Sequence, residues 1–216
     1  MEKLPRVFAV YKPKGPTSAH FLNELKRKLH IVKMGHAGTL DPLASGVLVV
    51  GIGEGTKELH TIVQGEKEYE AMIRLGITST TDDEEGQKKE IEVGRIPSEE
   101  EIRKTLKEFI GEIKQIPPIF SAIKIKGKEA YKLARKGSIP EMKAREAKIF
   151  TIDLVKYSWP MLHIRVTTGS GVYIRALARD IGATLGTGAY LADLERTRVG
   201  KFTKEEAIKS TILQPR

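Results

Sequence analysis

The sequence of 216 residues contains no cysteine, and this absence excludes several kinds of site at once. Disulfides, thiolate metal sites and cysteine nucleophiles all need a residue that the chain lacks. The five histidines stand at positions 20, 30, 36, 60 and 163, so no two are three or four residues apart. Because clustered ligands at short spacing are the usual sign of a zinc or iron site, we expect no metal and no metal cofactor.

Long hydrophobic runs are also missing. No stretch approaches the roughly 18 apolar residues that a membrane-spanning helix needs. Near the N-terminus the apolar run covers only residues 7–11, which is too short for a signal peptide. Hydrophobic residues at 40% and charged residues at 30% are typical of a globular domain with a core of its own. We therefore expect a monomeric cytoplasmic protein with no membrane partner.

The chain has glycines but lacks the known phosphate-binding loops. Residues 51–55 read G-x-G-x-G, which is not the dinucleotide fingerprint, and no G-x-x-x-x-G-K-[ST] motif occurs. Gly169 to Gly171 precede a predicted helix and could hold a phosphate, but a tight turn explains them better. A small-molecule nucleotide enzyme is therefore disfavoured, and no organic cofactor is expected.

Positive charge is in excess and unevenly placed. Lys and Arg number 37 against 28 Asp and Glu, which gives a net charge of +9. Residues 1–120 hold 18 basic and 19 acidic side chains, whereas residues 121–216 hold 19 and 9, so the second part carries +10. The excess points to a polyanion, most simply nucleic acid, although a basic surface can also serve solubility alone.

Hydrophobic periodicity predicts an α+β fold. Strands are predicted over residues 6–11, 46–51, 67–75, 148–156 and 161–168, with a turn near Trp159-Pro160 between the last two. Helices are predicted from a cap at Thr17 or Ser18, over residues 172–185, and from a capping box at Ser98 and Glu101 with an apolar stripe reaching Ile113. The acidic residues 82–85 are interpreted as a solvated turn rather than as paired catalytic carboxylates.

Two segments carry residue types suited to RNA chemistry. Residues 124–148 hold nine basic side chains against three acidic ones, with Tyr131 among them. Interleaved basic and aromatic residues suit contact with a nucleic-acid backbone, although a plain surface helix remains an alternative. The loop GHAGTLDPLASGVL at residues 35–48 presents Asp41, which Pro42 keeps out of helical geometry, beside His36, whose ring can stack on a base. An isolated aspartate of this kind can also be an ordinary turn residue.

These segments resemble the TruB family of tRNA pseudouridine synthases, in the family's order and over almost the whole chain. The similar stretches are YKPKGPTS at 11–18, GHAGTLDPLASGVLVVGIGEGTK at 35–57, KEYEAMIRLGITSTTDDEEG at 67–86, QIPPIFSAIKIKGKEAYKLARKG at 115–137 and VTTGSGVYIRALARDIGATLGTGAYLADLERTRVG at 166–200. The HAGTLDP loop is the most specific of them.

The resemblance implies a role for each matching residue. Asp41 would be the essential carboxylate, acting on the target uridine either as nucleophile or as base. Tyr69 would stack on the flipped uracil, and Arg175 would pair with Asp41 and keep it ionised. The remaining implied contacts to substrate or RNA are those of His36, Tyr173, Leu194, Lys12 and Tyr131. Taken singly, Tyr69, Leu194 and Arg175 could equally be two core residues and a surface cation.

The resemblance also implies an architecture and a substrate. It implies a mixed, largely antiparallel sheet flanked by helices in one catalytic domain over residues 1–216, with a thumb-like insertion at about 117–148. A C-terminal RNA-binding module of the PUA type is expected to be absent or truncated, since the chain ends at Arg216. The implied reaction converts uridine 55 in the T-loop of tRNA to pseudouridine after base flipping, without a cofactor. The alternatives are a synthase acting on another RNA stem-loop and a non-catalytic RNA-binding or RNA-folding protein.

Overall fold

The structure is a computed structural model that describes residues 4–121, 123–125, 127–134 and 141–209. Its strands are β1 (Val7–Lys12), β2 (Met34–Ala37), β3 (Ser45–Ile52), β4 (Lys67–Leu75), β5 (Ile77–Ser79), β6 (Lys88–Glu90), β7 (Gly111–Gln115), β8 (Lys124–Ile125), β9 (Lys128–Glu129), β10 (Arg145–Ser158), β11 (Met161–Thr168), β12 (Ala189–Val199), β13 (Phe202–Thr203) and β14 (Ile208–Lys209). Its helices are α1 (Ser18–Leu29), the 3-10 helix η1 (Gly53–Lys57), α2 (Leu59–Ile62), α3 (Glu99–Glu108), α4 (Ala130–Ala134) and α5 (Ile174–Thr184).

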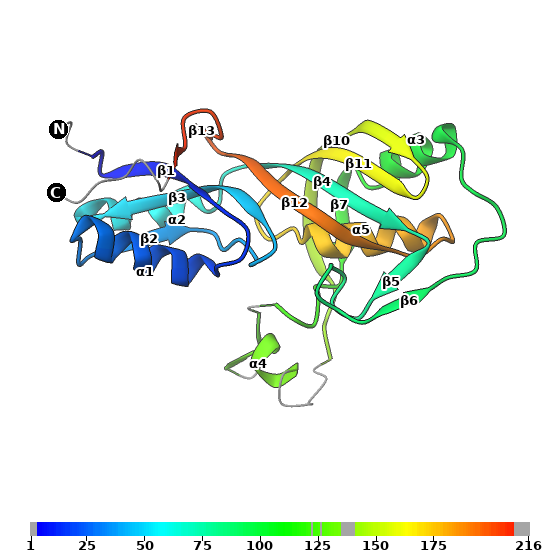
Figure 1. Ribbon diagram of the computed structural model, residues 1–216, viewed down its shortest axis with the longest axis horizontal. Helices are drawn as coiled ribbons and strands as arrows, with labels where there is room; N and C mark the ends of the chain where they lie inside the picture. Colours follow the sequence, from blue (N-terminus) through cyan, green and yellow to red (C-terminus); the bar gives the residue numbers. More distant parts are fainter. Residues whose placement is uncertain (1–3, 122, 126, 135–140, 210–216) are drawn as a thin grey trace. The chain divides into compact units, whose positions relative to one another are not determined.

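Most strands belong to one mixed sheet. Hydrogen-bonded neighbours follow the order β14-β1-β3-β12-β4-β11-β10-β7, and β2 and β13 pair beside β3 and β12 (Figure 1). β3 runs antiparallel to β1 and β2 but parallel to β12. The predicted α+β fold with a mixed, largely antiparallel sheet is confirmed.

The chain divides into two compact units that interleave along the sequence. Unit 1 comprises residues 1–70, 167–170 and 194–216, and unit 2 comprises residues 71–166 and 171–193. Strands β4, β11 and β12 each contribute residues to both units. No helix in the described part of the chain is long and apolar enough to cross a membrane.

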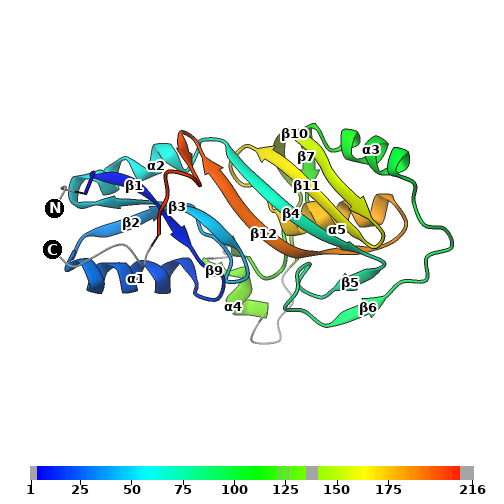
Figure 2. The same ribbon diagram turned by 45° about the horizontal axis from the view of Figure 1, so that its top comes forward.

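Unit 1 packs helices on both faces of its strands. Alternate residues of β1 and β3 enter two separate apolar clusters, as the period of two in a strand requires. One cluster holds Val10 and Leu48 beneath the buried side of α1, and the other holds Ala9 and Val49 with Leu59 of α2. Figure 2 shows α1 and α2 on opposite sides of these strands.

Helix α1 begins at a side-chain cap that also connects to the loop after β2. Thr17 is the cap, and its hydroxyl accepts the backbone N–H of His20 at 3.1 Å. Ser18 is buried instead, and its Oγ both accepts the N–H of Leu40 at 2.8 Å and donates to the carbonyl of Leu40 at 2.9 Å. The cap prediction is therefore resolved in favour of Thr17, and Ser18 ties the start of α1 to the residue before Asp41.

In unit 2, α5 runs along the strands of the unit and α3 lies beside β10 (Figure 2). The capping box at Ser98 and Glu101 is confirmed. The predicted helical stripe was too long, because α3 ends at Glu108 and residues 111–115 form β7. Gly111 adopts a φ of 110°, which breaks the helical path and lets the following residues pair with β10.

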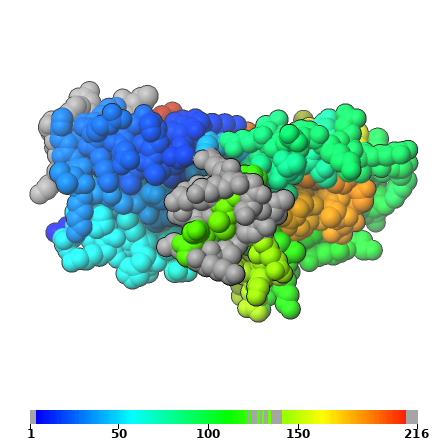
Figure 3. All heavy atoms as spheres, turned by 90° about the horizontal axis from the view of Figure 1, so that it is seen from below, coloured from blue at the N-terminus to red at the C-terminus, as the bar shows by residue number. Residues whose placement is uncertain are grey.

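The chain leaves the sheet after Gln115 and enters it again at Arg145, its partner in the same strand pair. Gln115 of β7 lies opposite Arg145 of β10, so the intervening segment is an excursion, which we call the basic insertion. Its described part contains the hairpin β8-β9 and helix α4. Figure 3 looks onto the face that carries this segment (green), where α5 (orange) is also exposed.

Gly46 lies where the backbones of β3 and β12 approach closely, so a side chain there is expected to destabilise the protein. Its φ is 111°, and a Cβ added there would lie 2.2 Å from the carbonyl oxygen of Arg196. We expect Gly46→Ala to lower the free energy of unfolding by about 2 kcal/mol or more, because strain and backbone overlap add. Gly94→Ala is the control, since nothing lies within 4 Å of that position. Equal urea-unfolding midpoints for the two variants would contradict the close approach.

Candidate active site

The loop that carries Asp41 is held in place from several sides within unit 1. The N–H of Ala44 bonds to the Asp41 carbonyl at 3.1 Å, and the N–H of Gly15 bonds to the carbonyl of Pro42 at 2.8 Å. On the other side of Asp41, Ser18 fixes Leu40 by two hydrogen bonds. Asp41 itself is half-buried. The aspartate therefore stands on a loop whose backbone has little freedom.

Lys12 lies beneath this loop with no exposed surface. Its ammonium donates to the carbonyls of Ala44 at 2.8 Å, Pro13 at 2.9 Å and Asp41 at 3.3 Å. Burial lowers the pKa of Lys12 to about 8, with the Arg196 charge lowering it further and the Asp41 charge opposing the shift. The three carbonyls match the three donors of an ammonium, so Lys12 connects the Asp41 loop to the residue that follows β1.

Arg196 on β12 is the centre of the same region. Its guanidinium is buried and donates to the carbonyls of Val47 at 2.8 Å and Gly38 at 3.1 Å. Burial lowers the pKa of Arg196, and a hydrogen bond with the Tyr69 side chain opposes this shift. Arg196 therefore joins β3, the loop before Asp41, and the candidate stacking residue on β4.

His36 lies close enough to Arg196 for the arginine's charge to act on its imidazole. Burial lowers the pKa of its imidazole, and the charge of Arg196 lowers it further. Its Nδ1 is buried without a hydrogen-bond partner. The ring is half-buried on β2, opposite Val50 of β3.

Tyr69 and Leu194 are almost fully buried, each with 7% of its surface exposed. Tyr69 stands in the alternating strand β4, whose odd-numbered residues are buried as the sequence pattern predicts. Leu194 lies on β12 two residues before Arg196. Both belong to unit 1 together with Lys12, His36 and Asp41.

The other two described candidates lie at the start of α5 in unit 2. Tyr173 caps the helix, and the side chain of Gln115 binds its backbone twice, accepting its N–H at 2.9 Å and donating to its carbonyl at 3.1 Å. Arg175 is buried, and its Nη1 lies 3.2 Å from Oδ2 of Asp83. Asp41 belongs to unit 1 and Arg175 to unit 2, so the predicted pairing of these two residues stays a prediction.

The buried pair with Arg175 corrects the interpretation of residues 82–85 as a solvated turn for the two aspartates, whereas Glu84 and Glu85 are exposed as expected. Asp83 is only 3% exposed, and it also accepts hydrogen bonds from the N–H of Glu85 and the hydroxyl of Thr81. Two adjacent aspartates pair with α5, because Asp82 lies 2.9 Å from Arg179. The local sequence of Asp82 and Asp83 did not indicate burial, because the arginines that pair with them stand more than ninety residues away in the chain.

Tyr131 belongs to α4, but its side chain lies outside the described residues. The role assigned to it therefore stays a prediction. Among the described residues, no group of three or more His, Asp or Glu side chains is arranged to hold a metal ion.

A family model described as "TruB family pseudouridylate synthase (N terminal domain)" matches residues 26–174. The chain belongs to the TruB family. A second TruB model, described as "tRNA pseudouridylate synthase B C-terminal domain", matches residues 175–215. Relatives named tRNA pseudouridine synthase B include one from Clostridium tetani, 44% identical over 94% of this chain and 70% of the relative. Another, from Parabacteroides distasonis, is 45% identical over 89% of this chain and 84% of the relative.

Solved structures of two complexes contain chains that are similar to this TruB family chain. A chain of a Cbf5-Nop10-Gar1 complex is 33% identical with a TM-score of 0.75, covering 95% of this chain and 52% of that chain. A chain of an H/ACA RNP bound to a substrate RNA containing 2'-deoxyuridine is 31% identical with a TM-score of 0.71, covering 94% and 50%. The chain thus spans about half the length of these solved chains.

Arg196 is the functional candidate that sequence reasoning missed in this TruB family chain. It belongs to the quoted stretch LERTRVG, yet charge alone did not separate it from Arg198 two residues later. Strand phase relates Arg196 to buried Leu194, but Arg198 has the same phase, so the pattern does not separate the two arginines. A cation on a buried phase needs acceptors nearby, and here these are backbone carbonyls.

Replacing Arg196 by lysine is expected to destabilise the protein. Lysine keeps the charge but cannot reach two carbonyls and Tyr69 as a planar guanidinium does. We expect Arg196→Lys to lower the free energy of unfolding by about 2 kcal/mol, since a buried carbonyl left unpaired costs about 1–3 kcal/mol. Arg198→Lys on the same strand is the matched control, because Arg198 is partly exposed and pairs with Glu66 at 3.6 Å. Equal losses in urea titrations would show that burial of Arg196 contributes nothing special.

His36 generates a prediction about pH. Because the folded state lowers the pKa of His36, the unfolded chain binds more protons between that value and about 6.5. Stability from the neutral ring is therefore present above about pH 6.5 and is lost as the pH falls through the lowered pKa. We expect the stability difference between wild type and His36→Gln to shrink as urea titrations move from pH 7.5 to pH 5. A difference that stays level or grows would be incompatible with a neutral buried ring.

Proposed function

We propose that this chain converts uridine 55 in the T-loop of tRNA to pseudouridine. Membership of the TruB family of pseudouridylate synthases supports the reaction, and the relatives' name, tRNA pseudouridine synthase B, supports the substrate. The observation that supports the assignment to this site is the position of Asp41 on a loop whose backbone is held by Lys12, Ser18 and Arg196.

The reaction needs a base that has left its stack. Flipping the uridine costs a few kcal/mol, and stacking on a ring returns roughly 1–3 kcal/mol per base. His36 is a half-buried ring on the strand that leads into the Asp41 loop, and Tyr69 is a buried ring that interacts with Arg196. We assign His36 to splaying the nucleotide and Tyr69 to stacking on the uracil. Tyr173 and Leu194 are assigned to the uracil pocket.

The chemistry breaks one bond and forms another within the same nucleotide. The bond between N1 and C1′ breaks, the base turns, and C5 bonds to C1′. The hydrogen of C5 is lost to water and N1 gains one, so no group is added and no electrons are transferred. Asp41 acts at this step either as the nucleophile on the sugar or as the base, and both roles need an ionised carboxylate. We propose that Arg175 pairs with it.

Recognition of the tRNA would rest on charge and shape. The basic insertion and the rest of residues 121–216 supply the positive surface, with a net charge of +10. RNA stem-loops are bound through phosphates, loop shape and splayed bases rather than by reading a duplex. We assign the T-arm to this surface, with Tyr131 at the contact and one copy of the chain per tRNA.

The decisive experiment measures tritium released from T-arm RNA that carries 5-tritiated uridine. We expect release by the wild-type chain, and a loss of roughly 10²–10⁴-fold or more in Asp41→Asn, because the amide cannot attack or accept a proton. Asp153→Asn, at an exposed position on β10, is the matched control and should release tritium at the wild-type rate.

Other outcomes of the tritium-release experiment would contradict the proposed carboxylate, the proposed substrate or the proposed catalysis. Release by Asp41→Asn at the wild-type rate would refute the assigned carboxylate. Release only from a different stem-loop would overturn the T-loop assignment, and the structural similarity to an RNP bound to substrate RNA makes that the relevant comparison. RNA binding without release from any stem-loop would indicate a non-catalytic RNA-binding or RNA-folding protein.

A further inference from the structure

Two arginines on one face of α5 contact the start of the basic insertion. Arg175 and Arg179 are four residues apart, which places them on the same side of the helix. Nη2 of Arg175 donates to the carbonyl of Phe120 at 3.0 Å, and Nη2 of Arg179 donates to the carbonyl of Ile116 at 2.8 Å. The first five residues of the insertion are therefore held by the guanidinium groups of this helix.

The same two guanidinium groups bind the two adjacent aspartates. Nη1 of Arg175 lies 3.2 Å from Asp83, and Nη1 of Arg179 lies 2.9 Å from Asp82. Each arginine thus uses one arm for the acidic loop and the other arm for the insertion, a geometry that lysine cannot reproduce. Arg179 additionally pairs with its neighbour Asp180 at 2.9 Å.

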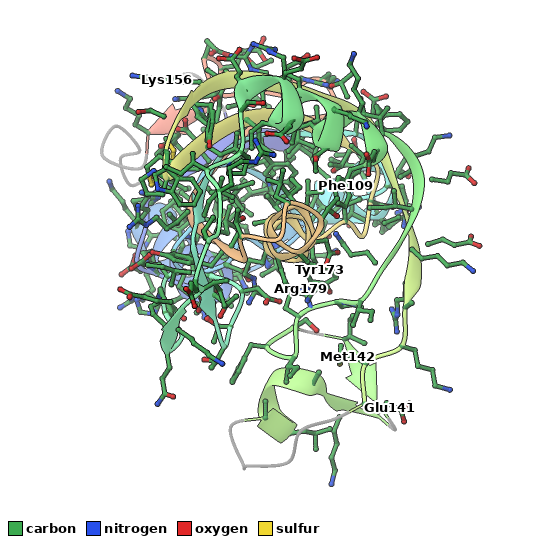
Figure 4. The ribbon with its side chains drawn as sticks, turned by 90° about the vertical axis from the view of Figure 1, so that its right-hand side faces the viewer. Phe109, Glu141, Met142, Lys156, Tyr173 and Arg179 are labelled. Carbon is green, nitrogen blue, oxygen red and sulfur yellow. The ribbon has the colours of Figure 1, made fainter. Side chains whose placement is uncertain are left out.

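The two ion pairs differ in their surroundings. Arg175 and Asp83 are buried, whereas the Arg179 side chain keeps 30% and the Asp82 side chain 15% of its surface exposed. Figure 4 shows Tyr173 and Arg179 on the side of α5 toward the insertion, with Met142 and Glu141 farther out along it. Asp82 also adopts a φ of 61°, a left-handed conformation that aspartate and asparagine tolerate better than most residues.

The insertion has the charge of a nucleic-acid-binding segment. Residues 116–144 contain seven Lys and Arg against two Glu, a net charge of +5. Cations of this kind bind phosphates, and such binding weakens with added salt. A basic segment can hold RNA in a productive position only if its base is fixed relative to the residues that receive the nucleotide.

We propose that Arg179, through its pair with Asp82, is a positioning residue that orients the basic insertion on α5 for RNA binding. The helix that Arg179 fixes to the insertion also carries Arg175 and begins after Tyr173. Binding of RNA by the insertion is thereby coupled to the placement of the candidate site residues on α5. The inference rests on the proposed function, because it assigns RNA as the ligand of the insertion.

Its test compares Arg179→Gln, Arg179→Lys, Asp82→Asn and the double variant Arg179→Gln/Asp82→Asn. Arg103→Gln is the matched control, since Arg103 pairs with Glu99 at 2.7 Å one helical turn away on exposed α3. KM and kcat come from tritium release with T-arm RNA, and Kd for the same RNA is measured over a series of salt concentrations. Thermal unfolding of every variant is recorded alongside.

We expect KM and Kd for Arg179→Gln to rise roughly fivefold or more, while kcat changes less than KM. The slope of log Kd against log salt should become shallower, because fewer phosphates are contacted. Arg179→Lys should rescue only in part. The double variant should be no weaker than the worse single variant, since paired residues are not additive. Arg103→Gln should match the wild type in KM, Kd and salt slope.

Three results would overturn the proposal. A lower unfolding temperature with unchanged KM and salt slope would make Arg179 a purely structural residue. A fall in kcat at unchanged KM would place it in the chemistry instead. If Arg179→Gln fails to fold, unchanged KM and Kd in both Arg179→Lys and Asp82→Asn would also overturn the proposal. A wild-type chain that binds the RNA but releases no tritium would refute the proposed function, while the Kd and salt measurements would still decide this inference.

Discussion

A buried guanidinium must find acceptors on every side, and around Arg196 those acceptors belong to the segments that carry the candidate active site. One arm binds the loop before Asp41, another binds β3, and Tyr69 completes the set. Removing any of these partners would leave charge or a carbonyl unpaired in the core. The loop, the strand and Tyr69 are therefore stabilised together rather than one by one.

Unit 1 and unit 2 satisfy their buried cations in different ways. Lys12 and Arg196 bind mainly backbone carbonyls, and the charge of Arg196 adds to burial in lowering the pKa of His36. In unit 2, by contrast, Arg175 and Arg179 face carboxylates.

The sequence predicted most of the local structure because periodicity reports burial directly. The alternation in β4, the capping box before α3 and the apolar face of α1 are all present. Prediction failed where distant segments decide the outcome. The apolar stripe ending at Ile113 was predicted to be helical, but residues 111–115 form a strand that pairs with β10. The acidic residues 82–85 were predicted to be solvated, but Asp83 is buried in its pair with Arg175. Motif resemblance named the candidate residues, but neither periodicity nor resemblance singled out Arg196, whose importance lies in its contacts.

The basic insertion begins and ends at two residues that face each other in the sheet. For a segment attached in this way, gain or loss of residues between Phe120 and Arg145 leaves the register of β7 with β10 unchanged. The added cost in closure entropy is small. Natural selection can therefore lengthen, shorten or recharge the outer part of this segment while the Asp41 loop and its buried cations stay as they are. Under the proposed function, the segment that binds RNA and the loop that carries Asp41 can therefore change separately, with residues 116–120 between them.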